Sequence, residues 1–77
     1  MKIFKLNRLM LERKFQGVEN LNKIDKIDLA DSGILTIDPD TFKGLNKVVL
    51  LYLNRNKITS LHPDTFKSAH FINMLHF

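Results

Sequence analysis

The segment IDKIDLADSGILTIDPDTFKGLNK occupies residues 24–47, and a second segment of equal length, VVLLYLNRNKITSLHPDTFKSAHF, follows it at residues 48–71. The two segments align without a gap, and the run Pro39–Lys43 is identical to Pro63–Lys67. Self-similarity at a fixed period of this length is typical of proteins built from stacked repeats. The aligned apolar pairs are Ile24 with Val48, Ile27 with Leu51, Leu29 with Leu53, Ile34 with Ile58, Ile37 with Leu61, Phe42 with Phe66 and Leu45 with Ala69.

Each copy has the pattern of a strand, a turn and a return segment. Leu51 and Leu53 occupy alternate positions, so their side chains point to one face of a strand over residues 51–54. A turn at Asn56 follows, and Pro63 suits the first position of a short helical turn because its missing N–H needs no partner there. In the first copy Asp38 stands before the proline, where a helix cap belongs.

A unit of this kind leaves its apolar side uncovered until the next unit stacks on it, strand beside parallel strand. The sequence therefore predicts an α/β solenoid with short parallel strands on its concave face and irregular or short helical returns on its convex face. Phe42 and Phe66 are predicted to stack on the inner side of the returns. A partial third copy at residues 72–77 places Leu75 in the strand.

The pattern Val48-x-x-Leu51-x-Leu53-x-x-Asn56-x-Ile58-x-x-Leu61-x-x-x-x-Phe66-x-x-Ala69 resembles a leucine-rich repeat of the 24-residue type. The resemblance covers residues 24–77 as repeats 24–47 and 48–71 and the partial third repeat. Repeats of this type are common in extracellular proteins and receptor ectodomains. The resemblance implies a fragment or truncated member of a larger receptor-like or secreted protein, located outside the cell or at its surface.

Asn56 occupies the position of the family's polar ladder, where an amide can both donate to and accept from the backbone of adjacent coils. Ser32 stands at the same position in the first copy and offers a single donor. We therefore expect Ser32 to be tolerated, with a weaker ladder at that position.

Residues 1–23 fit the repeat less well, and two registers remain open. One continues the 24-residue period and places Ile3, Met10, Val18 and Leu21 in the core, together with Lys5 and Arg13. The other takes Leu6-x-x-Leu9-x-Leu11 as a strand. In either register we expect a degenerate first repeat or N-terminal cap, helical in part, in preference to an unfolded leader.

The concave face is the predicted binding surface. Stacked parallel strands bring residues one period apart side by side, about 4.8 Å from each other. Exposed apolar groups that the core does not need often mark a partner surface. The predicted protein-binding residues are Lys26, Asp28, Leu50, Tyr52, Asn54, Met74 and His76, in rows that include Lys26, Leu50 and Met74, and Asp28, Tyr52 and His76.

Charge and composition argue against other functions. The formal net charge of +4 lies in residues 1–14, and the remaining residues carry seven basic and seven acidic side chains. A basic stripe across a folded face is therefore not expected, and neither is nucleic-acid binding. The first residues lack the uninterrupted apolar run of a secretory signal, and no apolar run approaches the length of about 20 that spans a bilayer. The chain has no cysteine.

Enzymatic activity, a small-molecule substrate, a metal site and a cofactor are not predicted. His62, His70 and His76 have spacings of eight and six, which do not match the spacings of metal-binding motifs. No glycine-rich phosphate loop is present. His62 lies at the position of Asp38 and is expected to replace it at the start of the return segment.

Protein–protein recognition through the concave face is the favoured function, with a protein ligand or receptor component as partner and self-association through the C-terminal edge strand. The alternative is a basic N-terminal segment that binds anionic membrane or nucleic acid, with the repeats as a passive scaffold.

Overall fold

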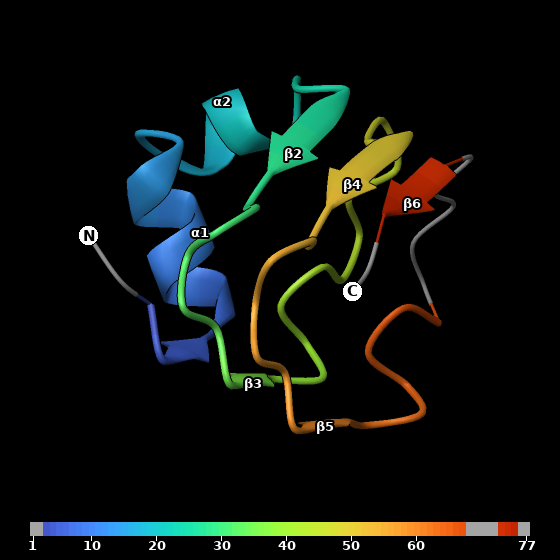
Figure 1. Ribbon diagram of the computed structural model, residues 1–77. Coiled ribbons are helices and arrows are strands. Elements are labelled where there is room, and N and C mark those ends of the chain that lie inside the picture. Colours follow the sequence, from blue (N-terminus) through green and yellow to red (C-terminus); the bar gives the residue numbers. More distant parts are fainter. Residues whose placement is uncertain (1–2, 68–72, 76–77) are drawn as a thin grey trace.

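Two parallel sheets of three strands each organise the structure (Figure 1). The computed structural model describes residues 3–67 and the backbone of residues 73–75. One sheet has the strand order β2-β4-β6 and the other has the order β1-β3-β5. The elements are β1 (Lys5–Leu6), α1 (Arg8–Lys14), α2 (Val18–Leu21), β2 (Lys26–Asp28), β3 (Thr36–Ile37), β4 (Leu50–Tyr52), β5 (Ser60–Leu61) and β6 (Asn73–Leu75).

The two complete repeats lie in register, each residue beside its counterpart one period along the chain. Ile27 pairs with Leu51 in one sheet, and Ile37 pairs with Leu61 in the other. The predicted parallel strands are therefore present, although β4 begins one position earlier than expected. Parallel hydrogen bonding also continues beyond β2, because the Asp31 N–H donates to the Asn54 carbonyl at 2.9 Å.

The second sheet was not predicted. The return segments contain the short strands β3 and β5, which hold β-branched Thr36 and Ile37 and the pair Ser60 and Leu61. After β3 the chain forms successive hydrogen-bonded turns, with the Thr41 N–H donating to the Asp38 carbonyl at 3.1 Å, in place of the expected short helix. Each return segment thus joins the neighbouring coil through backbone hydrogen bonds before it turns.

Asp38 and His62 start equivalent turns, as the sequence indicated. The Asp40 N–H donates to Asp38 Oδ2 at 3.2 Å, and the Asp64 N–H donates to His62 Nδ1 at 3.1 Å. The imidazole nitrogen can accept this bond only in its unprotonated form.

The core runs between the two sheets. Phe42 is fully buried, and its ring stacks on that of Phe66 with centroids 5.8 Å apart and planes 20° from parallel, as predicted. Aromatic pairs at this separation add stabilisation beyond the burial of their area. The other side chains of the core that are at most 1% exposed are Leu6, Leu11, Leu21, Ile27, Leu29, Ile34, Leu45, Val48, Leu51 and Leu53.

Asn56 joins the two repeats through its side-chain amide. Nδ2 donates to the Leu29 carbonyl of the first repeat at 2.9 Å and to the Leu53 carbonyl of its own repeat at 3.0 Å. Oδ1 accepts from the N–H groups of Ser32 at 2.9 Å and Ile34 at 3.0 Å. The Ser32 hydroxyl, in contrast, donates only within its own coil, to the Ala30 carbonyl at 3.3 Å.

Residues 3–21 form an N-terminal segment that lies beside the first repeat (Figure 1). Its strand β1 pairs with β3, so that Leu6 lies opposite Ile37. The sequence separation of these two residues is longer than one repeat. The segment therefore extends the β1-β3-β5 sheet of the return segments, and it contributes no strand to the β2-β4-β6 sheet. Asn7 caps α1 by accepting from the Met10 N–H at 2.9 Å.

Both registers considered for this segment are wrong in part. Val18 is 48% exposed, although the continued period placed it in the core, and Leu9 is 53% exposed on a helix where the rival register placed a strand. For Leu9 the physical reason is the helix α1, whose period of about 3.6 residues turns Leu11 inward and Leu9 outward.

Candidate functional site

The outer face of the β2-β4-β6 sheet contains most of the predicted binding residues. We call the side chains of Lys26, Asp28, Leu50 and Tyr52 the strand face. Ile27 and Leu51 alternate with them and are fully buried, whereas Lys26 and Asp28 are exposed and Leu50 and Tyr52 are half-buried. This strict alternation along each strand separates the core side of the sheet from its open side.

Backbone pairing arranges the strand face in two rows. Lys26 lies beside Leu50, and Asp28 lies beside Tyr52, as the repeat period predicted. Each row places one charged group next to one apolar or amphipathic group. The Asp28 carboxylate also accepts from the Ala30 N–H at 3.1 Å, which ties it to the end of its own strand. The strand face can therefore contact a partner surface through a tyrosine, a leucine and two charges of opposite sign.

The third strand does not follow the predicted rows. Asn73 pairs with Leu50, and Met74 pairs with Leu51, so the position predicted for Met74 beside Leu50 is wrong. The step from β4 to β6 is thus one position shorter than the step from β2 to β4. His76 lies outside the described residues.

Asn54 follows β4 at the end of the strand face. It is half-buried, and its carbonyl accepts from Asp31 on the neighbouring coil. Asp31 and Arg55 both adopt left-handed backbone conformations, with φ of 53° and 59°. These two residues occupy equivalent positions of the aligned repeats, so the same bend ends the strand in both.

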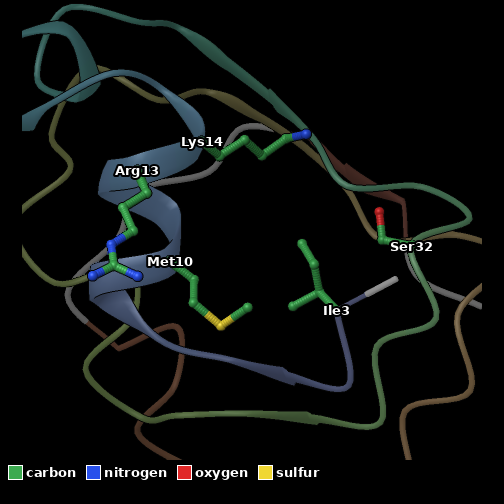
Figure 2. A pocket seen from close by; sticks show the side chains of 5 residues that line it. All are labelled: Ile3, Met10, Arg13, Lys14 and Ser32. Atoms are coloured by element: carbon green, nitrogen blue, oxygen red, sulfur yellow. The ribbon is translucent and has the colours of Figure 1, made fainter. Parts of the chain in front are cut away.

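A hollow of about 360 Å³ opens beside α1, and the sequence interpretation missed it (Figure 2). Met10, Arg13 and Lys14 come from α1, Ile3 from the residues before β1, and Ser32 from the turn after β2. In Figure 2 the Lys14 side chain extends from the helix towards the turn that contains Ser32, and Met10 points into the hollow. The spacing of Met10, Arg13 and Lys14 was the available signal, because positions three and four apart share one helix face.

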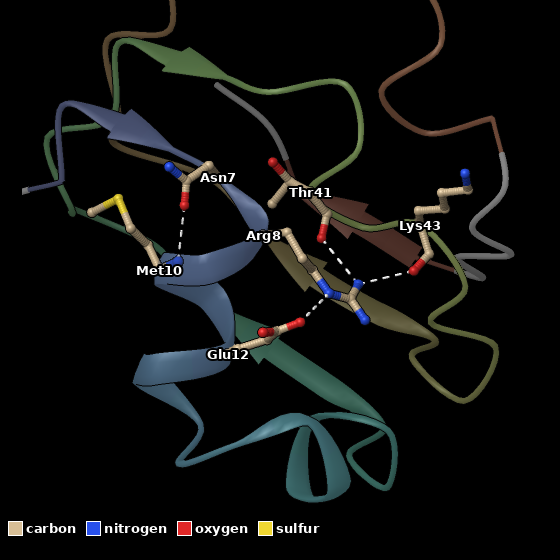
Figure 3. A network of polar contacts seen from close by, with 6 residues as sticks. All are labelled: Asn7, Arg8, Met10, Glu12, Thr41 and Lys43. Carbon is tan, nitrogen blue, oxygen red and sulfur yellow. Dashed lines mark hydrogen bonds and ion pairs between the residues drawn. The ribbon is translucent and has the colours of Figure 1, made fainter.

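Arg8 anchors the basic N-terminal segment to the first repeat (Figure 3). Its Nη1 donates to the carbonyls of Lys43 at 2.9 Å and Thr41 at 3.2 Å, and its Nε forms an ion pair with Glu12 Oε2 at 3.1 Å. The side chains of Arg8 and Glu12 are about one quarter exposed. One of the basic groups of residues 1–14 thus binds within the fold itself.

Within residues 3–67 and 73–75, no group of three or more histidine, cysteine, aspartate or glutamate side chains is placed to hold a metal ion. His62, the histidine within this range, lies 3.9 Å from the Asp64 carboxylate, and both side chains are more than half exposed. Neither helix in the same range is long and apolar enough to cross a membrane.

Comparison with known proteins agrees with the repeat architecture. A family model described as leucine rich repeat matches residues 22–76, which is more than half of the chain. Neither the curated proteins nor the solved structures gave a match. Given the extent of the family match and the in-register pairing of parallel strands from successive repeats, the chain belongs to the leucine-rich repeat family.

Proposed function

We propose that this protein recognises another protein through the strand face, on the concave side of a short solenoid. Leucine-rich repeat domains commonly take part in protein–protein interaction and typically act as binding scaffolds without catalytic activity. The observation that supports the strand face as the binding surface is the row pairing of Lys26 with Leu50 and of Asp28 with Tyr52. These side chains stand on strands whose alternate residues are fixed in the core.

Tyr52 and Leu50 are the expected anchors of the contact. Tyrosine offers a large apolar ring and a hydroxyl at little cost in conformational entropy, which is why it is enriched at protein interfaces. Lys26 and Asp28 flank these anchors and favour a partner that presents charges of both signs around an apolar centre. Such charges contribute more to specificity and association rate than to affinity.

The test uses proteins from the organism's own extracts or cell surface, captured on the immobilised chain and identified by mass spectrometry. The affinity of the purified partner is then measured for the wild type and for the double variant Leu50→Ser with Tyr52→Ala. The matched control is Thr59→Ala with Ser60→Ala, two exposed positions in and beside β5. We expect the strand-face variant to raise Kd at least tenfold and the control to leave it unchanged. Equal affinities for all three proteins would show that the partner binds elsewhere.

We further propose that the protein is receptor-like or secreted and works outside the cell or at its surface. The support is the spacing of the repeats, which is common in extracellular members of the family. A tagged gene product that stays in the cytoplasm of its own organism would contradict this assignment.

The alternative function, binding of anionic membrane or nucleic acid by the basic N-terminal segment, has weaker support. Leu6 and Leu11 of that segment are buried in the core, and Arg8 is held by two carbonyls and Glu12. These residues serve the fold, and Lys5, Arg13 and Lys14 remain as its exposed cations among residues 3–14.

A further inference from the structure

The hollow beside α1 combines an apolar floor with a cationic rim. Ile3 is 8% exposed and belongs to the core, and Met10 is half-buried and packs against the core. Arg13 and Lys14 are exposed at the rim. The volume of about 360 Å³ lies at the lower end of the range for small-molecule sites, which is about 300 to 1,000 Å³.

The two rim cations have no acidic partner in the part of the chain that the structure describes. The acidic residue next to them in sequence, Glu12, faces Arg8 instead, and the described side chains that line the hollow include no carboxylate. A ligand with a negative group would therefore meet two uncompensated positive charges. Long basic side chains also keep their apolar stems along the surface while their charged ends stay in water, so the rim extends the apolar wall.

Methionine makes this floor adaptable. Its unbranched side chain has several rotatable bonds and a polarizable sulfur, and it is over-used at surfaces that accept varied apolar ligands. In Figure 2 Met10 and Ile3 point into the same space from opposite sides, below the extended Lys14 side chain. An alkyl chain laid between them would lose contact with water along most of its length.

We propose that this hollow binds a small anionic amphiphile, a monomeric carboxylate on an alkyl chain, with the chain against Ile3 and Met10 and the carboxylate at Arg13 and Lys14. The charge complementarity of the rim selects the negative head group, and the volume limits the ligand to a medium-length chain. The site lies on a different part of the molecule from the strand face, so its failure would leave the proposed protein recognition untouched.

The experiment is an NMR titration of the full chain with octanoate, in its monomeric concentration range, following backbone amides and the Met10 methyl group. Octanol and octyltrimethylammonium are the matched probes, with the same alkyl chain and a neutral or reversed head group. The variants are Arg13→Gln with Lys14→Gln, which removes the rim charges, and Met10→Asp, which places a negative charge on the floor. The control is Lys23→Gln with Lys47→Gln, which makes the same change in net charge at exposed positions outside the hollow.

We expect octanoate to shift the signals of Ile3, Met10 and Ser32, and to bind more tightly than either matched probe. The rim variant should raise the octanoate Kd about tenfold, since two exposed charge contacts are lost. The Met10→Asp variant should abolish binding, and the control variant should change Kd less than twofold. In the spectrum of each variant, signals from residues outside the hollow should stay at their wild-type positions, which shows that the variant keeps the fold.

Three results would overturn the proposal. The first is the absence of octanoate-induced shifts at the residues that line the hollow. The second is equal binding of octanol and octanoate, or equal losses in the rim and control variants, because the rim cations would then have no selective role. The third is a combination of two observations: the chain does not respond to monomeric octanoate, but it binds phosphatidylglycerol vesicles, and Met10→Asp does not reduce that binding. This combination would identify a membrane surface as the source of the anionic group.

Discussion

The replacement of Asn56 by alanine tests how the two repeats are held together. The alanine leaves three backbone groups of the first repeat without their partner: the Leu29 carbonyl and the N–H groups of Ser32 and Ile34. Leu29 and Ile34 are fully buried, and Asn56 itself is half-buried. An unsatisfied buried group costs about 1 to 3 kcal/mol, and water can reach part of this turn. Taking about 1 kcal/mol for each group gives a loss of about 3 kcal/mol.

Ser32→Ala is the matched comparison, because it removes one side-chain hydrogen bond at the equivalent position of the first repeat. We expect it to cost less than about 1 kcal/mol, since the hydroxyl bonds only within its own coil. Urea titrations followed by circular dichroism give both free energies of unfolding. If the Asn56 variant is unfolded without urea, refolding it with trimethylamine N-oxide gives the same comparison. A larger loss for Ser32→Ala than for Asn56→Ala would refute the bridging role of Asn56.

Three further predictions concern the N-terminal segment, the buried threonines and the sheet edge. Arg8→Gln should lower the free energy of unfolding by about 1 kcal/mol in urea titrations, because the ion pair with Glu12 and the hydrogen bonds to the first repeat are lost from a partly exposed site, where solvent weakens them. Lys5→Gln should leave the free energy of unfolding unchanged. Thr65→Val should be neutral or stabilising in thermal melts, because the buried Thr65 hydroxyl has no hydrogen-bond partner among the described residues. Thr41→Val should instead destabilise by about 1 kcal/mol through loss of the hydrogen bond from the Thr41 hydroxyl to the Asp38 carbonyl. The 77-residue chain should dimerise or aggregate at micromolar concentration in sedimentation experiments, because β6 is the outer strand of its sheet in the described structure; a concentration-independent monomer would contradict this.

The period of the sequence was sufficient to predict the central repeats. Seven aligned apolar positions identify which residues face the core, and the stacked pair Phe42 and Phe66 follows from the identical runs that contain them. The strand rows of β2 and β4 follow from the same alignment. These features depend on local alternation and on one constant repeat length, and both can be read directly from the residues.

The remaining features depend on contacts that the period does not encode. The pairing of Leu6 with Ile37 joins two segments that are separated by more than one repeat, so no extrapolation of the constant step could have found it. Asn7 as helix cap and the basic residues of the last turn of α1 are readable signals for a segment that is helical in part, but they do not specify which strand β1 pairs with. At β6 the constant period again fails, because the pairing with β4 shifts by one position.

The difference between Asn56 and Ser32 connects the repeat ladder with the hollow beside α1. Asn56 reaches back to a complete coil, whose turn presents the Leu29 carbonyl and the Ser32 N–H. The N-terminal segment instead meets the first repeat through backbone pairing, with the Ile3 N–H donating to the Ser32 carbonyl at 2.7 Å. No earlier turn among the described residues therefore stands where a side chain at position 32 could bridge to it, and Ser32 lines the hollow instead. The serine is thus the end of the ladder among the described residues, and it lines the hollow together with Met10, Arg13 and Lys14.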